Sequence, residues 1–114
     1  MLKKYILPVR EADREIYELI KSGKKKVETR AGGPKYQNIQ KGDVIVLKCG
    51  KSKFERTVAE VRKFKSVNGM LRRYKPSDIH PDIQSAEELI NLYHSFPGYD
   101  QRLKKHGIMV FELE

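Results

Sequence analysis

The stretch Ile20-Lys-Ser-Gly-Lys-Lys-Lys-Val-Glu-Thr-Arg30 connects the end of a helical pattern to a short and highly charged segment. Gly23 is expected at a helix exit, because glycine readily takes the left-handed conformation that ends many helices. Counting onward from this glycine gives a G-x-K-x-x-E-x-R spacing that ends at Arg30. The stretch therefore predicts a helix, a glycine cap and then a charged strand.

A strand over residues 24–30 alternates its side chains between two faces. The alternation predicts one charged face, formed by Lys24, Lys26, Glu28 and Arg30. It predicts an opposite face formed by Lys25, Val27 and Thr29. A solvated edge strand can carry such charges for solubility alone. A cleft for an anionic ligand has the same pattern, so both interpretations stay open at this point.

The residues before this stretch predict a strand and a helix. Residues 1–7 alternate weakly and predict a first strand, which Pro8 would end. Between residues 10 and 21 the apolar side chains recur at helical spacing, namely Ala12, Ile16, Leu19 and Ile20. Acidic residues lie toward the start of this helix and Lys21 lies at its end, as the helix dipole favours.

The residues after the stretch predict several strands and short helices. Strands are expected at 44–47, after a Lys41-Gly42-Asp43 turn, at 53–65, with a bulge where the alternation slips, and at 108–113. Helices are expected at 66–74, after the capping box Ser85-Ala-Glu-Glu88, and at 99–106. This order predicts a single α+β domain over residues 1–114 with a mixed or antiparallel sheet. Such sheets often curl into small barrels.

The composition indicates an anionic partner. The 114 residues include 24 basic and 15 acidic side chains, a formal charge of +9. This excess favours polyanions through long-range attraction and counterion release. Nucleic acid is favoured over a membrane, because no predicted helix sets a broad apolar face against a purely basic one. The alternative is a basic surface that serves only solubility.

The sequence contains no recognisable signal for membrane insertion or export. No apolar run is long enough to cross a bilayer. The N-terminal residues 1–8 lack the apolar region and small-residue cleavage site of a signal peptide. We therefore expect a cytoplasmic protein with no membrane partner.

Metal, cofactor and nucleophile motifs are absent from the sequence. Cys49 is the only cysteine, which excludes an intrachain disulfide, and its apolar surroundings predict burial. His80, His94 and His106 form no pair at metal-ligand spacing. There is no phosphate-loop pattern and no G-x-S-x-G element. We expect no metal and no cofactor.

The charged stretch itself holds the candidates for chemistry. Lys25 could serve as a general base if burial lowered its pKa, with Glu28 beside it. Arg30 could hold a phosphate or a base edge by paired hydrogen bonds. A surface network of ion pairs, which contributes little stability, explains the same residues equally well.

Aromatic residues next to basic ones suggest contacts to RNA, because unpaired bases stack on exposed rings. Most rings are expected in the core, and Tyr36 and Tyr99, predicted in loops, are the better candidates for stacking. Two basic clusters are candidates for phosphate contacts: Arg72, Arg73 and Lys75, and Arg102, Lys104 and Lys105. Solvated helix ends explain these clusters almost as well.

The stretch Ile20–Arg30, followed by Ile39-Gln-Lys-Gly-Asp-Val-Ile-Val-Leu47, resembles the ASCH domain (activating signal cointegrator homology). The helix from Ser85 to Tyr93 and the closing segment Lys104 to Glu112 also fit this family. The likeness covers nearly the whole chain and points to the small stand-alone ASCH proteins of prokaryotes.

The resemblance implies a PUA-like small β-barrel with inserted short helices and a cleft beside the G-x-K-x-x-E-x-R element. It implies an RNA-binding domain whose basic cleft takes RNA or a nucleotide, in RNA processing or in the regulation of translation or transcription. The residues expected at the ligand are Lys24, Lys25, Lys26, Glu28, Arg30 and Tyr36.

The same family implies an alternative function as a hydrolase, since its members include a ribonuclease and an acetylcytidine amidohydrolase. The functional lysine of the amidohydrolase falls on Lys25, with Lys25 and Glu28 as the catalytic candidates. Its threonine position holds Glu28, with Thr29 one residue out of register, and Glu87 or Glu88 would supply its distal glutamate. This departure argues against the same mechanism. A third interpretation is a protein-interaction module for an acidic partner.

Overall fold

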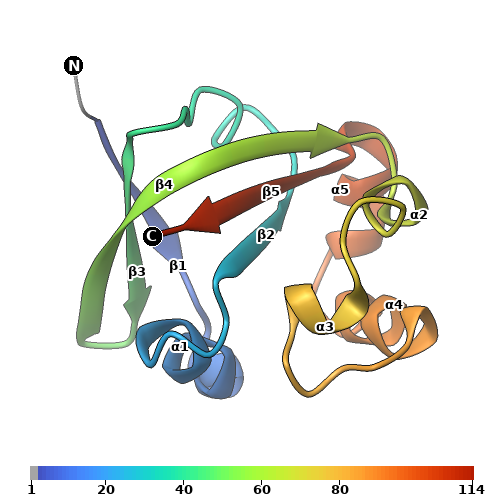
Figure 1. The fold of residues 1–114 in the computed structure, drawn as a ribbon, viewed down its shortest axis with the longest axis horizontal. Helices are drawn as coiled ribbons and strands as arrows, with labels where there is room; N and C mark the ends of the chain where they lie inside the picture. The colour runs from blue at the N-terminus through green and yellow to red at the C-terminus, as the bar shows by residue number, and fades with distance from the viewer. Residues whose placement is uncertain (1–2) are drawn as a thin grey trace.

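The computed structural model describes residues 3–114 as a five-stranded sheet with short helices packed around it (Figure 1). The strands are β1 (Lys4–Pro8), β2 (Val27–Ala31), β3 (Val44–Cys49), β4 (Ser52–Phe64) and β5 (Ile108–Leu113). A 3-10 turn η1 (Glu11–Asp13) leads into α1 (Arg14–Lys21). The other helices are α2 (Val67–Met70), α3 (Pro76–Ile79), α4 (Ala86–His94) and α5 (Tyr99–His106).

The sheet is mixed, and its strand order is β1-β3-β4-β5-β2. Strands β1 and β3 are parallel, whereas β3/β4, β4/β5 and β5/β2 are antiparallel. The expected α+β fold with a mixed sheet is therefore confirmed. Closure into a barrel is not observed among residues 3–114, since β1 and β2 form the two open edges of the sheet.

The long strand β4 joins the two halves of the sheet. Its first half pairs with β3 and its second half with β5, with a shift in register between Val58 and Glu60. This irregularity is the bulge predicted from the slip in alternation. A bulge increases the local twist of a strand, and β4 curves across the whole molecule in Figure 1.

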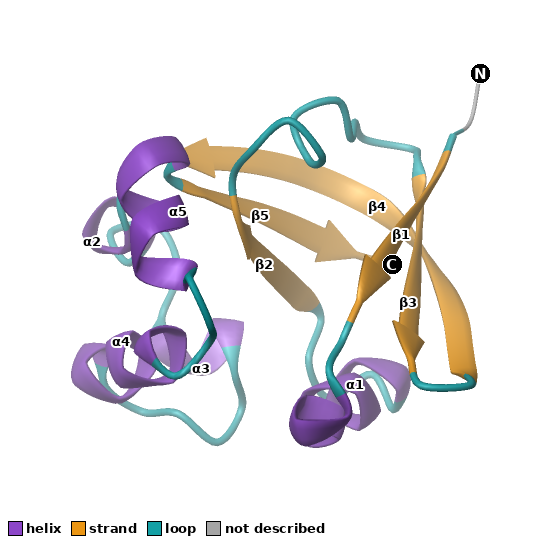
Figure 2. Ribbon diagram, turned by 180° about the vertical axis from the view of Figure 1, so that it is seen from behind, coloured by secondary structure: helices purple, strands orange, loops and turns teal. Residues whose placement is uncertain are grey.

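Two hydrophobic clusters lie on different parts of this sheet. One contains buried side chains of α1 and of strands β1, β3 and β4, including Tyr17, Ile20 and Leu47. The other contains side chains of β2, β5 and helices α2 to α5, including Leu89 and Tyr93. Figure 2 shows α1 and the group α2–α5 as separate layers beside the strands. Strand β2 lies between them.

Several predicted boundaries differ from the structure. Pro8 belongs to β1, because an edge strand tolerates a residue without a backbone N–H. The predicted helix 66–74 ends at Met70, and a further helix that the pattern did not predict, α3, follows at Pro76–Ile79. Pro76 at the first position favours that helix, and the Asp78 carboxylate accepts the Lys75 N–H at 2.9 Å.

Two of the predicted strands also begin at other residues than expected. The strand expected at 24–30 begins only at Val27, and the part of the first strand predicted at residues 1 and 2 lies outside the described residues. Within residues 3–114, no helix is both long enough and apolar enough to span a bilayer.

Candidate functional site

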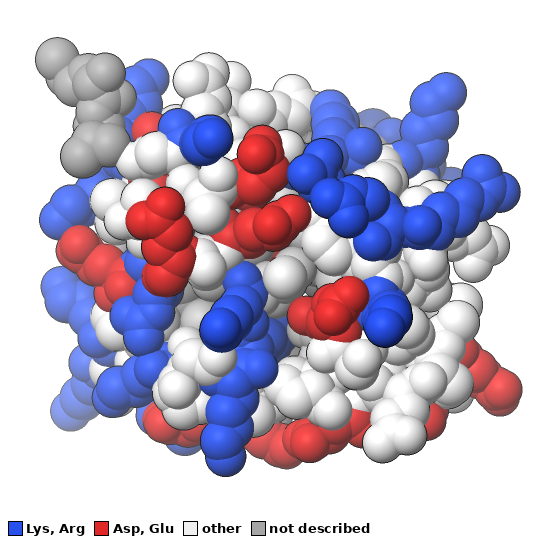
Figure 3. All heavy atoms as spheres, in the orientation of Figure 1, with Lys and Arg blue, Asp and Glu red and all other residues white. Residues whose placement is uncertain are grey.

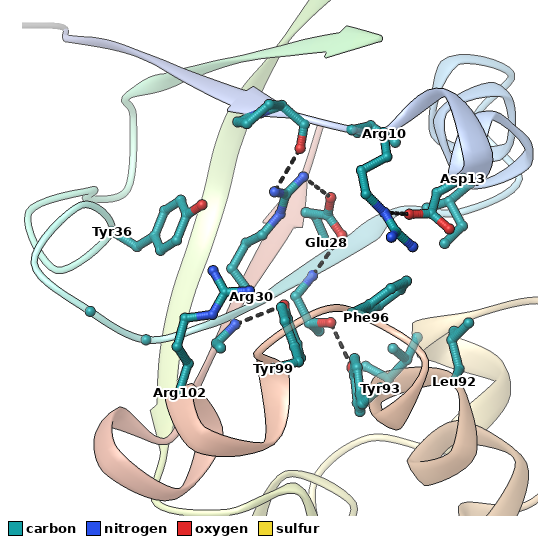
Figure 4. A pocket seen from close by; sticks show the side chains of 18 of the residues that line it. Arg10, Asp13, Glu28, Arg30, Tyr36, Leu92, Tyr93, Phe96, Tyr99 and Arg102 are labelled. Atoms are coloured by element: carbon teal, nitrogen blue, oxygen red, sulfur yellow. Dashed lines mark hydrogen bonds and ion pairs between the residues drawn. The ribbon is translucent and has the colours of Figure 1, made fainter.

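A cavity of about 600 Å³ opens beside β2, between the β1–α1 junction and helices α4 and α5. The loop after β2, which contains Gly32, Gly33 and Tyr36, forms another wall. The polar side chains lining the cavity are Arg10, Asp13, Lys25, Glu28, Thr29, Arg30, Lys35, Tyr36, His80, Tyr93, Tyr99, Arg102 and His106. Figure 4 shows β2 side chains pointing into this space from one side and aromatic rings from the other.

Three charged side chains of the stretch Ile20–Arg30, namely Lys25, Glu28 and Arg30, meet at the floor of the cavity. Lys25 and Glu28 are only 4% and 5% exposed. The Lys25 Nζ atom lies 3.7 Å from Glu28 Oε1, and Arg30 Nη2 lies 3.1 Å from Glu28 Oε2. Lys25 also donates to the Val27 carbonyl, and the Thr29 N–H donates to Glu28 Oε1 at 2.9 Å. The Glu28 carboxylate is thus shared between two cations.

This arrangement shifts the pKa of each group. Burial lowers the pKa of the Lys25 amine, and the nearby Arg30 charge adds to this, against the opposing effect of Glu28. Burial alone would raise the pKa of Glu28, but the charges of Arg30 and Lys25 outweigh it and hold that pKa below its usual value. The cluster therefore favours an ionised carboxylate next to a lysine that loses its proton more readily than usual.

The predicted division of these residues between two faces is wrong. Lys25 lies with Glu28 and Arg30, whereas Lys24 and Lys26 are exposed and line a second, separate hollow. The reason is that residues 24–26 precede the strand. The Lys25 N–H donates to the Leu19 carbonyl at 3.0 Å, which keeps this segment in the turn that leaves α1.

An aromatic wall faces the charged cluster. The rings of Tyr93 and Tyr99 stack with centroids 5.7 Å apart, and Phe96 meets Tyr99 edge to face at 5.2 Å. Hydrogen bonds fasten this wall to β2: Tyr93 Oη lies 2.6 Å from Thr29 Oγ1, and Tyr99 Oη accepts the Ala31 N–H at 2.8 Å. Burial raises the pKa of Tyr99 to about 12, so its phenol stays neutral.

The two tyrosines singled out in the sequence differ in their environment. Tyr36 lies in a loop, as predicted, and is half-buried with Lys35 Nζ 5.6 Å from its ring centroid. Tyr99 instead begins α5 and is buried. Tyr93 and Phe96 were not candidates, because neither has a lysine or arginine beside it in the sequence and most rings were expected in the core.

Further charged side chains lie around the cavity. Arg10 pairs with Asp13 at 2.7 Å, and its guanidinium carbon lies 5.7 Å from the Phe96 ring centroid. Arg102 similarly lies 5.2 Å from the Tyr99 ring centroid. Arg10 carried no signal in the sequence, since only the fold brings the β1–α1 junction next to α4.

Arg30 has a second role in the architecture. Its Nη1 atom donates to the Pro8 carbonyl at 2.8 Å, which links the two open edges of the sheet through a side chain. Figure 4 shows this guanidinium between the end of β1 and the Glu28 carboxylate. The cavity therefore lies where the sheet fails to close.

The histidine, cysteine and distal glutamate candidates differ in whether they reach the cavity. His80 lines the cavity, and burial, together with the Lys25 charge, lowers its pKa. Cys49 is buried, as expected. Glu87 and Glu88 are exposed on α4 and do not line the cavity. Among residues 3–114, no group of three or more His, Cys, Asp or Glu side chains is arranged to hold a metal ion.

The fold and the site define a small α+β protein with a charged, aromatic-lined cavity at an open sheet edge. The sequence profile of the ASCH domain matches residues 13–114, so the chain belongs to the ASCH domain family. This confirms the resemblance seen in the sequence. No curated protein matches the chain.

Two solved structures are similar over nearly the whole chain. The crystal structure of the hypothetical protein PH0355 has 33% identity and a TM-score of 0.83, covering 98% of each chain. The solution NMR structure of protein PF0455 from Pyrococcus furiosus has 32% identity and a TM-score of 0.73, covering 98% of this chain and 96% of that one.

Proposed function

We propose that this protein binds RNA and that the cavity beside β2 takes one of its nucleotides. The observation that carries the proposal is the pairing of a cationic floor with an aromatic wall in one cavity of about 600 Å³. This volume lies within the range of small-molecule sites in proteins. The ASCH family is associated in general with RNA binding, which agrees with this chemistry.

The charges of the cavity support an anionic ligand. Arg10, Arg30, Lys35 and Arg102 line it along with the buried Lys25, against the carboxylates of Asp13 and Glu28. Both carboxylates already have cationic partners at 2.7 and 3.1 Å. A guanidinium carries five N–H donors. Arg30 uses two of them on Glu28 and the Pro8 carbonyl, and Arg102 uses two on the Gly98 and Pro97 carbonyls. Both side chains therefore keep donors suited to phosphate oxygens.

The rings supply the second element of nucleotide recognition. Phe96 and Tyr36 are each half-buried and lie on different sides of the cavity. Partly exposed rings can stack on an unpaired base without regard to its identity. The proposal therefore predicts a preference for single-stranded over double-stranded RNA.

A titration with single-stranded RNA at several salt concentrations tests this function. We expect log affinity to fall linearly with log salt, since bound cations displace counterions from the phosphates. Arg102→Ala removes an exposed side chain from the cavity, and we expect it to weaken binding and to reduce the salt slope by about 0.7, the value for one single-strand phosphate contact.

Lys51→Ala provides the control, because Lys51 is exposed in the β3–β4 turn and lines neither hollow. Its affinity should match that of the unmodified protein. Absence of RNA binding even at low salt would contradict the proposed function.

The buried Lys25 amine favours a hydrolase as the second candidate. Its lowered pKa and its position 3.7 Å from Glu28, at the cavity floor, suit a general base. The residue set of the amidohydrolase is not reproduced, however. Glu28 occupies the threonine position, Thr29 bonds to Tyr93, and Glu87 and Glu88 lie outside the cavity. A hydrolase here would depend on Lys25 and Glu28.

Incubation with acylated cytidines and with labelled RNA tests this second function. If the hydrolase hypothesis holds, product forms and Lys25→Met, which keeps an unbranched apolar stem, abolishes turnover. Thermal melting of the same variant serves as the control for folding. Turnover that survives the substitution would remove Lys25 from the mechanism, and no turnover by the unmodified protein leaves binding as the function.

A further inference from the structure

A second hollow, of about 380 Å³, lies on the other side of the segment that precedes β2. Helices α2 and α3 border it through the turn between them, and β5 borders it near the C-terminal end. Its lining residues are Lys24, Lys26, Val27, Arg73, Tyr74, Ser77, Asp78 and Glu112. The basic cluster of residues 72–75, singled out in the sequence, thus meets the charged stretch here.

Both carboxylates of this hollow are already engaged. Glu112 Oε2 accepts the Tyr74 hydroxyl at 2.6 Å and lies 3.4 Å from Arg62 Nε. These partners lower the pKa of Glu112, Tyr74 being the stronger influence. Asp78 accepts the Lys75 N–H at 2.9 Å and caps α3. Neither carboxylate neutralises the lysines across the hollow.

Three basic side chains of the hollow form no ion pair within residues 3–114, although the charge of Arg73 contributes to the lowered pKa of Glu112. Lys24, Lys26 and Arg73 are exposed, and none of them lies within ion-pair distance of a carboxylate in residues 3–114. Basic and acidic side chains are interleaved over much of the face in Figure 3. What distinguishes this hollow is that its cations converge from two distant parts of the chain.

The two hollows share one segment of backbone. Lys25 enters the first cavity, while its neighbours Lys24 and Lys26 line the second hollow. The backbone of residues 24–26 therefore borders both sites. One flexible strand is thus offered cations at two neighbouring places along this segment.

We propose that the second hollow binds backbone phosphates of the same RNA strand that places a nucleotide in the cavity. The proposal rests on the RNA-binding function proposed above. Lys24 and Lys26 act as point charges, and Arg73 offers a planar fork of donors to phosphate oxygens. The Tyr74 ring, 5.5 Å from the Arg73 guanidinium carbon, restricts the orientation of that fork.

A membrane surface fits this hollow less well. Binding at a lipid interface needs apolar side chains beside the basic ones. Among residues 3–114 the one large hydrophobic side chain that is widely exposed is Ile6, at 57%, and it lies on β1 at the opposite edge of the sheet from β2. The chemistry of the hollow therefore favours the phosphates of a nucleic acid.

The test compares two triple variants with two ligands. Lys24→Ala/Lys26→Ala/Arg73→Ala removes the second hollow's cations, and Lys48→Ala/Lys51→Ala/Lys53→Ala removes three exposed charges from the β3–β4 hairpin. The ligands are a single-stranded RNA of about ten nucleotides, within the usual range of site sizes, and a nucleoside 5′-monophosphate. Thermal melting of each variant checks the fold.

We expect the first variant to bind the longer RNA roughly tenfold more weakly at low salt, with a salt slope smaller by about 2, as three lost phosphate contacts imply. The hairpin variant should change both values much less. Binding of the monophosphate should be equal in both, because it occupies only the cavity.

Two results would overturn the second site while leaving the proposed function intact. One is an equal loss of affinity for the longer RNA in the two variants, which would show that only the net charge of the protein matters. The other is an equal loss of affinity for both ligands in the first variant, which would mean that Lys24, Lys26 and Arg73 act on binding in the cavity. If the unmodified protein binds neither ligand, the proposed function itself fails, and the second site fails with it.

Discussion

Replacing Glu28 by glutamine is expected to lower the free energy of unfolding by about 3–5 kcal/mol, the typical cost of leaving a buried charge uncompensated. Glutamine has nearly the same shape and can still accept the Thr29 N–H that Glu28 accepts at 2.9 Å. It cannot neutralise Lys25 and Arg30, which lie 3.7 and 3.1 Å from the carboxylate. Chemical denaturation of both proteins measures the difference.

The loss of stability in Glu28→Gln should depend on pH. Without the carboxylate, the pKa of Lys25, which burial already lowers, falls further. Between that pKa and the ordinary lysine pKa of the unfolded chain, the folded variant binds fewer protons than the unfolded chain, so its stability rises with pH. We therefore expect the difference from the unmodified protein to be larger at pH 6 than at pH 9.

A double variant and a surface variant serve as controls. Adding Lys25→Met to Glu28→Gln removes one of the two repelling cations, so part of the lost stability should return. Glu55→Gln breaks the exposed pair with Lys4, and we expect a loss of about 0–1 kcal/mol. An equally small loss in Glu28→Gln would show that the buried cluster contributes little to folding.

Local sequence patterns were sufficient to predict most of the helices and strands. Gly23 has a φ of +83°, and its N–H donates to the Ile20 carbonyl, as a helix cap requires. Ser85 accepts the Glu88 N–H at 3.1 Å, so the capping box correctly placed the start of α4. These features depend on neighbours within a few residues, which the sequence displays directly.

The composition of the site depended on contacts between distant residues. Thr29 meets Tyr93 and Ala31 meets Tyr99 across more than sixty positions, so no local pattern could place those rings in the cavity. The segment 24–26 was misassigned for a different reason. Alternation predicts faces only inside a strand, and a backbone hydrogen bond to Leu19 keeps Lys25 outside it.

The open sheet also has a physical reason that the strand pattern does not contain. Barrel closure requires the edge strands to exchange backbone hydrogen bonds. Here Arg30 reaches from β2 to the Pro8 carbonyl of β1, and a side chain spans the gap instead. The last residue of the G-x-K-x-x-E-x-R element thus has two roles, since Arg30 both joins the sheet edges and lines the cavity.

Gly107→Ala is expected to have the other large effect on folding, because Gly107 joins α5 to β5 at a place that only glycine fits. Its φ of 73° and ψ of −157° lie in a region that costs other residues about 1–3 kcal/mol. An added Cβ atom would also lie 2.3 Å from the Phe64 carbonyl oxygen. Relieving such an overlap within the packed structure typically costs about 1–3 kcal/mol more.

Gly107→Ala should also disturb the cavity. The Gly107 carbonyl accepts the N–H of Gly32 at 2.8 Å, and Gly32 lies directly after β2 in the cavity wall. Gly23→Ala is the matched control: its φ is also positive, but an added Cβ atom meets nothing within 4 Å. We expect Gly23→Ala to cost about 1–2 kcal/mol and Gly107→Ala clearly more in the same denaturation experiment. Equal losses would mean that the end of β4 moves aside easily and that the overlap with the Phe64 carbonyl adds little.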